Sequence, residues 1–203
     1  MIKFDTTPIL GYPITHFKKK IVKDKSLFNE IEYSYPLKDG GVSISKDHYI
    51  LNNKKFSDIK DVIIGVVEKY KTDILGIKNN IQITNSWVTK NEPGCKHFLH
   101  YHPNVFISLT HYIDCESGSL KFQFDRSVIS RDWSISYDII DYNIFNSESW
   151  TFDVKTDSTV IFPGVIKHQS TTNNSNKKRL MLGANFFFKG QYGTYEDLNK
   201  VVF

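Results

Sequence analysis

Four of the seven histidines of this chain lie within residues 94–112. In His100-Tyr101-His102 two imidazoles stand at positions i and i+2, which project from the same face of an extended strand about 7 Å apart. His168 lies far downstream, and Arg179 follows it by eleven residues. Neutral imidazole is a common ligand of iron, zinc and copper. Two close histidines and a distant one therefore suit one face of a metal octahedron, with positions left open for substrate and oxygen.

Other interpretations of the histidines stay open. A local structural zinc site built from Cys95, His97, His100 and His102 is one, although this segment lacks the paired C-x-x-C spacing of zinc modules. His97 and His111, taken singly, are most typical of core or surface histidines. A lone His-x-His pair also occurs on exposed strands without any metal.

Arg179 stands immediately before the apolar run 180–188. A guanidinium that enters a protein core is unfavourable unless it meets an anion. Bidentate recognition of a carboxylate is the usual reason for such a placement. The alternative is that Arg179 points into solvent beside Lys177 and Lys178.

The elements that must position these residues are mainly strands. After residue 80 the pattern becomes strand-like, with turn residues between the segments, and it covers residues 81–84, 106–113, 119–124, 149–154, 158–162 and 180–188. The clearest helix is 57–75, with Ser57 as its N-cap and Gly76 at its end. Short strands with mostly antiparallel connections predict a mainly β jelly roll preceded by N-terminal helices.

Length and composition predict a single domain. The chain has 203 residues, and 40% of them are hydrophobic, which is enough for a sizeable core. We expect an N-terminal strand and helical support at 1–80, the jelly-roll core at 81–190 and a C-terminal tail at 191–203.

Charge and cysteine content narrow the partners and the compartment. The 26 basic residues nearly balance the 22 acidic ones, so a nucleic-acid partner is not expected. Two cysteines are too few for a disulfide scaffold, which favours a reducing cytoplasm. No apolar run has the length of a membrane span or a signal peptide. Abundant Lys, Asn and Ile with a single alanine indicate an AT-rich genome, as in some viruses. The expected compartment is therefore a cytoplasm, which includes the cytoplasm of a virus-infected host cell.

Taken in order, these residues resemble the iron(II)- and 2-oxoglutarate-dependent oxygenases, and in particular a small branch common in marine bacteria and cyanophages. The resemblance covers residues 6–188. Its motifs are individually short, and their order and spacing carry it: Thr7-Pro8-Ile9, Asn85-Ser86-Trp87, Gly94, His100-Tyr101-His102-Pro103-Asn104, Ser108, His111-Tyr112-Ile113, Asn143-Ile144-Phe145-Asn146-Ser147, residues 160–168, Arg179 and Asn185-Phe186.

The resemblance implies a double-stranded β-helix with iron bound by His100, His102 and His168. Most members of the wider superfamily carry Asp or Glu at the second position, where an anionic ligand offsets the Fe(II) charge. Here that position is His102, which leaves the site more positive. Two alternatives follow: a carboxylate such as Asp125 takes part, or one histidine of the pair is not a ligand.

The resemblance also implies a pocket for 2-oxoglutarate. Arg179 and the hydroxyl of Tyr112 would hold its distal carboxylate, and Asn104 and Ser108 would line the same pocket. The implied reaction uses Fe(II), 2-oxoglutarate and O2 to hydroxylate a substrate that the sequence does not identify, with succinate and CO2 as co-products. Trp87 and the aromatic-rich segment 133–145 would roof the substrate mouth, unless they pack in the core as aromatic residues more often do.

Two rival classes remain at this point. Gly94 with His100-x-His102, and then residues 163–168, resemble the two metal motifs of cupins, but the glutamate expected soon after His102 is missing. A cupin-like oxygenase would use the metal without 2-oxoglutarate, so Arg179 discriminates between the two. The other rival is a non-enzymatic β-sandwich binding module with incidental histidines. A hydrolase is not favoured, because the chain has no G-x-S-x-G motif and neither cysteine has a convincing base partner.

Overall fold

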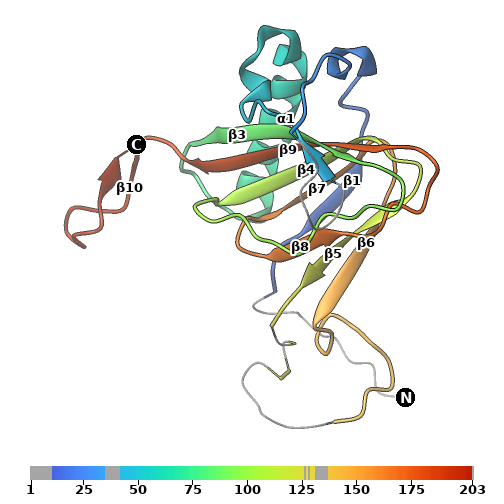
Figure 1. Ribbon diagram of the computed structural model, residues 1–203. Coiled ribbons are helices and arrows are strands. Elements are labelled where there is room, and N and C mark those ends of the chain that lie inside the picture. Colours follow the sequence, from blue (N-terminus) through green and yellow to red (C-terminus); the bar gives the residue numbers. More distant parts are fainter. Residues whose placement is uncertain (1–10, 35–41, 126, 128, 131–136, 203) are drawn as a thin grey trace.

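The structure is a computed structural model that describes residues 11–34, 42–125, 127, 129, 130 and 137–202 (Figure 1). The motif Thr7-Pro8-Ile9 and the first part of the aromatic-rich segment, residues 133–136, lie outside the described residues.

Two antiparallel sheets form the body of the molecule. The larger has the strand order β1-β7-β4-β9-β3-β2, and its strands are β1 (Thr15–Lys18), β2 (Val42–Ile44), β3 (Ile81–Asn91), β4 (Ile107–Asp114), β7 (Ser158–Pro163) and β9 (Arg179–Phe188). The smaller has the order β6-β5-β8, with β5 (Gly118–Gln123), β6 (Ser149–Val154) and β8 (Lys167–Ser170). Figure 1 shows the smaller sheet facing the larger one on the side opposite the helices.

The space between the two sheets, here called the barrel interior, has its own apolar cluster. Tyr112 and Met181 contribute from the larger sheet, and Leu120 and Phe122 from the smaller one. Since side chains alternate along a strand, every second residue of β4 and β9 faces this interior. This arrangement confirms the predicted mainly β jelly roll.

The helices cover the other face of the larger sheet (Figure 1). Helix α1 (Ser57–Lys69) continues into the π-helical turn η4 (Tyr70–Ile74) and stops at Gly76, whose φ is +66°. Ile59, Ile63 and Val67 repeat every four residues and pack into the apolar core beneath the helix. Within the described part of the chain, no helix has both the length and the apolar character that a membrane crossing requires.

The predicted N-cap of this helix is wrong. Ser57 already has helical dihedrals, and Phe56 occupies the cap without a side-chain hydrogen bond. The reason is the 3₁₀ turn η3 (Lys54–Phe56), which leads directly into α1 and whose own cap is the side chain of Asn53. Two further 3₁₀ turns, η1 (Lys25–Phe28) and η2 (Ile50–Asn52), precede it.

The C-terminal segment forms a small hairpin of β10 (Gln191–Tyr192) and β11 (Val201–Val202). Figure 1 shows it extending away from the two sheets. The expected division into support, core and tail at residues 80 and 190 stays a prediction.

Candidate metal and cofactor site

Backbone hydrogen bonds bring the two histidine segments together. His100 and His168 form an isolated antiparallel bridge, in which each backbone N–H donates to the other's carbonyl, at 3.0 and 2.8 Å. The N–H of His102 donates to the carbonyl of Gly164 at 2.9 Å. The segment 100–102 is thus held beside β8, and the three side chains meet at the end of the barrel interior.

The three imidazoles have the spacing of ligands to a single ion. His100, His102 and His168 each offer one ring nitrogen, and these atoms lie within 4.8 Å of one another. The Nε2 atoms of His102 and His168 are 3.2 Å apart. Two cis ligands at metal–nitrogen distances of about 2.1 Å are separated by about 3 Å. The donor set therefore fits a divalent transition metal.

Hydrogen bonds to the backbone set the tautomer of two of these rings. Nδ1 of His100 lies 2.8 Å from the carbonyl oxygen of Phe98, and Nδ1 of His168 lies 2.9 Å from that of Ile166. Because a carbonyl only accepts, both Nδ1 atoms carry the proton. Both Nε2 atoms therefore present a lone pair, as a metal ligand must.

Burial keeps the three imidazoles neutral. Desolvation lowers the pKa of His102 to about 4, with the nearby His100 as a second cause. Burial is also the main cause that lowers the pKa of His168 well below its usual value, and burial lowers the pKa of His100. Neutral rings at pH 7 are the form that binds a metal ion without first losing a proton.

The other two histidines of residues 94–112 lie outside the metal-ligand group. The ring centroid of His97 is 4.3 Å from that of His100, and burial, followed by the charges of His100 and His102, lowers the pKa of His97 to about 3. His111 is buried in β4, where its Nδ1 lies 2.8 Å from the hydroxyl of Thr159. Asp125, the carboxylate considered from the sequence, is 82% exposed and forms an ion pair with Lys167 at 2.6 Å.

Arg179 enters the barrel interior from the first position of β9 and is only 1% exposed. Its Nη1 donates to the carbonyl of Thr171 at 2.9 Å and its Nη2 to that of Thr172 at 3.2 Å. Among the described residues, no carboxylate forms an ion pair with it, and its Nε has no hydrogen-bond partner. A Cβ added to Gly118 would lie 2.9 Å from Nη2, so the glycine leaves room for the guanidinium.

Tyr112 shares this part of the barrel interior. Its side chain is fully buried, and its hydroxyl has no hydrogen-bond partner among the described residues. Burial raises the pKa of this phenol, and the positive charge of Arg179 partly offsets the rise. Two orphaned donors, the Tyr112 hydroxyl and the Arg179 Nε, are the groups that an anionic ligand would satisfy.

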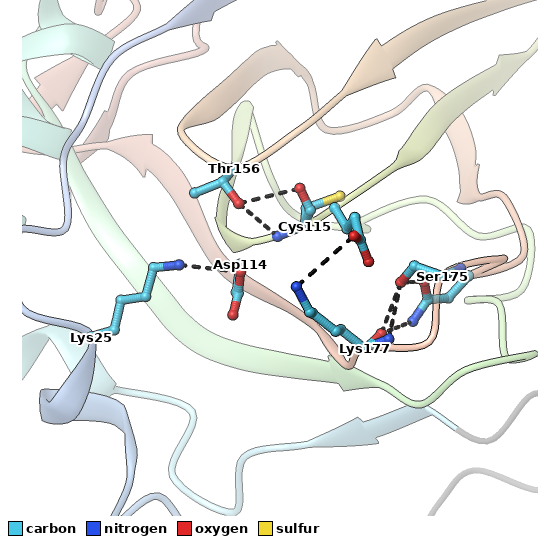
Figure 2. A network of polar contacts seen from close by, with 8 residues as sticks. Lys25, Asp114, Cys115, Thr156, Ser175 and Lys177 are labelled. Carbon is cyan, nitrogen blue, oxygen red and sulfur yellow. Dashed lines mark hydrogen bonds and ion pairs between the residues drawn. The ribbon is translucent and has the colours of Figure 1, made fainter.

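Figure 2 shows a network of polar contacts around the residues that follow β4. The Thr156 hydroxyl accepts from the Cys115 N–H at 2.9 Å and donates to the Cys115 carbonyl at 3.2 Å. The Ser175 hydroxyl donates to the Lys177 carbonyl at 3.0 Å, and the Lys177 ammonium lies 3.9 Å from the Glu116 carboxylate. The Thr156 contacts tie the residue after β4 to the turn that precedes β7, and the Lys177–Glu116 ion pair joins the segment after β4 to the loop that precedes β9.

The two remaining predicted pocket residues differ in placement. Ser108 is buried in β4 opposite Asn185 of β9, and its hydroxyl donates to the Asn185 Oδ1 at 2.7 Å. Asn104 is exposed in the turn after His102, with φ at +59°, and its contact with a cofactor stays a prediction.

Two further residues contact His102. The Asn185 Nδ2 lies 3.1 Å from the His102 Nδ1, a role that the sequence interpretation did not assign. The period-2 pattern of β9 was a usable signal, because it places Asn185 on the same face as Arg179. Trp87, expected at the substrate mouth or in the core, stacks its ring on that of His102 at a centroid distance of 5.5 Å.

A hollow of about 930 Å³ lies along β6. Tyr137, Tyr142 and Trp150 line it, together with Glu148. Trp150 pairs with Phe122 of β5, which in turn pairs with His168 of β8. The hollow therefore borders the sheet that carries His168.

Comparison with known proteins agrees with this geometry. Residues 85–185 match the family described as "Putative 2OG-Fe(II) oxygenase", and this range contains His100, His102, His168 and Arg179. The chain belongs to the 2OG-Fe(II) oxygenase family. No curated protein matches it in sequence. The family implies Fe(II), 2-oxoglutarate and O2 as cofactor and co-substrates; the marine or cyanophage branch stays a prediction.

Solved structures with the same fold are distant in sequence. A 2OG-Fe(II) oxygenase-family oxidoreductase from Burkholderia pseudomallei aligns with a TM-score of 0.54 at 10% identity, over 79% of this chain and 74% of that chain. Two non-heme alpha-ketoglutarate-dependent enzymes of nogalamycin biosynthesis both align with a TM-score of 0.58 at 10% identity. The match to the carbocyclase SnoK covers 87% of this chain and 80% of that chain, and the match to the epimerase SnoN covers 89% and 79%. At this identity the likeness establishes the fold of this oxygenase-family chain.

Proposed function

We propose that this chain is an Fe(II)- and 2-oxoglutarate-dependent dioxygenase that hydroxylates its substrate and releases succinate and CO2. The observation that carries the proposal is Arg179, a buried guanidinium without a carboxylate partner among the described residues, in the same barrel interior as a three-histidine cluster. A buried cation requires a compensating anion, and the dicarboxylate co-substrate of this family supplies one.

In this proposal the three histidines hold the metal. The Nε2 lone pairs of His100 and His168 are presented by Nδ1–H bonds to backbone carbonyls, so neither ring has to rearrange. His102, two residues after His100, completes the facial set. Asp125 takes no part, because its carboxylate is exposed and paired with Lys167.

Arg179 and Tyr112 hold the far end of 2-oxoglutarate. The Arg179 Nε–H and the Tyr112 O–H are two donors without a hydrogen-bond partner among the described residues, and both belong to side chains buried in the barrel interior. A carboxylate that accepts from both would neutralise the guanidinium and satisfy the phenol. The carbonyls of Thr171 and Thr172 keep the guanidinium in place when the co-substrate leaves.

Bound iron, together with 2-oxoglutarate and O2, supplies the oxidative chemistry. The chain itself contributes orientation and the exclusion of water, because His168, Tyr112 and Arg179 are almost fully buried.

We place the primary substrate in the hollow along β6, whose volume lies in the range of small-molecule pockets. Trp150→Ala should then keep the uncoupled oxidation of 2-oxoglutarate, and loss of that activity would contradict the placement.

Succinate formation from 2-oxoglutarate with added Fe(II) tests the proposal. We expect His168→Ala to abolish even uncoupled turnover and Arg179→Ala to reduce it sharply. His48→Ala is the matched control, because His48 is exposed and lies outside the metal-ligand group. Equal turnover in all these proteins would refute the assignment.

Binding measurements separate the rival classes. Metal analysis of the protein purified without added iron, followed by titration with 2-oxoglutarate, gives three distinct results. Metal together with 2-oxoglutarate binding supports the proposal, and metal without it favours a cupin-like oxygenase. A protein that binds neither the metal nor 2-oxoglutarate would favour a non-enzymatic β-sandwich module.

A further inference from the structure

The segment 143–147, one of the motifs in the sequence, forms a loop that is held by its own hydrogen bonds. The Asn146 Oδ1 accepts from the Asn143 N–H at 2.8 Å, and the Asn143 Oδ1 accepts from the Phe145 N–H at 2.9 Å. The Asn146 Nδ2 donates to the Asp141 carbonyl at 2.9 Å. Asparagine side chains that bond to nearby backbone groups in this way stabilise a turn locally. The loop therefore has a defined shape before any ligand binds.

Two backbone hydrogen bonds attach this loop to the rest of the fold. The Ile129 N–H donates to the Phe145 carbonyl at 3.1 Å, and the Phe124 N–H donates to the Glu148 carbonyl at 2.7 Å. Glu148 immediately precedes β6, so the loop leads directly into the strand that carries Trp150. Residues of the loop and of β6 together form most of the wall of the hollow along β6.

Three aromatic rings line this hollow with their faces free of other rings. Tyr137, Tyr142 and Trp150 are 41%, 75% and 38% exposed. Within the described part of the chain, none of the three stacks on another ring, and no Lys or Arg side chain lies over one of them. The Tyr137 hydroxyl lies 3.1 Å from that of the buried Ser127, which holds this ring in place. Exposed aromatic surface of this kind indicates a binding site.

The charge around the hollow is negative, although the chain as a whole carries a net charge of +4. Glu148 lines the hollow, and its carboxylate has no ion-pair partner among the described residues. The sequence of residues 137–154 contains four acidic residues and no Lys, Arg or His. Charges of one sign around a concave surface raise the local concentration of ligands of the opposite sign.

The lysines near β6 that the structure describes do not occupy the hollow. In the β5–β6 register Lys121 pairs with the residue after Trp150. Because side chains alternate along a strand, Lys121 and Trp150 project from opposite faces of the smaller sheet. Lys155 follows β6 at the end away from the loop, and Lys167 is paired with Asp125 at 2.6 Å. The aromatic faces are thus left open to a positively charged ligand.

We propose that the hollow recognises a substrate that carries an organic ammonium group. The inference rests on the proposed function, because it names the class of the substrate placed there. A cation over the face of an aromatic ring is attracted by the ring quadrupole, and Trp is the most favourable ring for this contact. The Glu148 carboxylate adds a full negative charge beside the rings. A neutral group gains neither interaction.

Strand register also sets the distance between the Trp150 position and the metal-ligand group. Trp150 pairs with Phe122, and Phe122 pairs with His168. Adjacent strands are about 4.8 Å apart, so the backbone positions of Trp150 and His168 lie about 10 Å apart across the sheet. The Phe122 ring lies 6.0 Å from the His168 ring. The ammonium group therefore serves recognition and is not the group that reacts.

Ligand-observed NMR titrations of the full-length metal-free protein, without 2-oxoglutarate, test the class of the ligand. The probes are choline, butylammonium and 3,3-dimethylbutan-1-ol, a neutral alcohol with the shape of choline. We expect the tighter-binding cation to bind about 5- to 30-fold more tightly than the alcohol, as one well-formed cation–π contact predicts. The order of the two cations distinguishes a quaternary from a primary ammonium group.

Substitutions test the location of the binding site. Trp150→Leu should weaken binding of the cation at least about fivefold and change the affinity for the alcohol little, because leucine is apolar but has no aromatic face. Glu148→Gln should weaken binding of the cation about 2- to 5-fold. Glu196→Gln is the matched control, because it makes the same substitution at an exposed position outside the hollow. Glu148→Gln keeps the test decisive if Trp150→Leu does not fold.

Three results would overturn the inference alone: binding of neither cation, equal affinity for the alcohol and both cations, or a cation affinity that neither Trp150→Leu nor Glu148→Gln changes. None of these results affects the proposed function, because succinate formation from 2-oxoglutarate is measured without these probes. A wild-type protein that forms no succinate would instead refute the proposed function and, with it, the assignment of a substrate class. The two failures are therefore distinguishable.

Discussion

The Nε2 atoms of His102 and His168 lie 3.2 Å apart although 66 residues separate them in the chain. At that distance one nitrogen carries a proton and the other does not, or both are ligands of one ion. Two protonated imidazolium rings are not compatible with it, because like charges repel strongly at short range and both rings are largely shielded from water. The fold therefore selects neutral histidines at this site.

The first prediction is that the metal-free protein loses stability as the pH falls from about 6.5 to 4. Burial lowers the pKa of His102 and of His111 to about 4 in the folded state, against about 6.5 in the unfolded chain. The unfolded chain then binds more protons in this window, so the free energy of unfolding decreases as the pH falls. Each such histidine contributes about 1 kcal/mol per pH unit.

Urea unfolding at pH 7 and pH 5 measures this effect. His111→Gln should flatten part of the pH dependence, because an amide does not titrate. His48→Gln is the control, since it makes the same substitution at an exposed position. A free energy of unfolding that is the same at both pH values would contradict the buried neutral histidines.

Tyr112→Phe should have opposite effects on stability and on co-substrate binding. The Tyr112 hydroxyl is buried without a partner among the described residues, so its removal should stabilise the protein by about 1 kcal/mol in the absence of 2-oxoglutarate. The same change removes one donor to the carboxylate and should weaken 2-oxoglutarate binding by roughly 5- to 10-fold. Thermal unfolding and calorimetry with Mn(II) in place of iron measure the two effects. Unchanged 2-oxoglutarate affinity would exclude Tyr112 from the pocket.

Gly118→Ala should weaken 2-oxoglutarate binding and leave metal affinity unchanged. The new methyl group would lie 2.9 Å from the Arg179 Nη2 and would displace the guanidinium. We expect a loss of at least about tenfold, equivalent to about 1.4 kcal/mol. Gly65→Ala is the matched control, because an added Cβ meets nothing within 4 Å there. Wild-type 2-oxoglutarate affinity in Gly118→Ala would show that Arg179 does not hold the co-substrate.

Asp125→Asn should not change the affinity for Co(II). The Asp125 carboxylate is 82% exposed and its partner is Lys167, so the substitution removes only a surface ion pair. Such pairs contribute between 0 and about 1 kcal/mol to stability. Calorimetry of Co(II) binding checks this, and a weaker affinity would bring the carboxylate back into the ligand set.

Several features of this protein were readable from the residue order alone. Local hydrophobic periodicity predicted the helix from residue 57 and most strands of both sheets, because backbone conformation responds to neighbours three or four positions away. The i, i+2 spacing of His100 and His102 is likewise a local property of an extended segment. The resemblance to the oxygenases rested on the order of such short motifs.

The contacts that make the site depended on how the strands pair. The prediction of Ser57 as N-cap was wrong because the 3₁₀ turn η3, capped by Asn53, leads directly into α1. Helix propensity alone does not decide which of two adjacent positions begins the helical segment. That Asn185 meets His102 follows from the β4–β9 register and from the bridge between His100 and His168. Register is the outcome of packing along whole sheets, and a shift of one residue would turn Asn185 and Arg179 away from the barrel interior. The sequence alone therefore indicated which residues could take part in chemistry. Their mutual distances, their burial and their protonation depend on the tertiary structure.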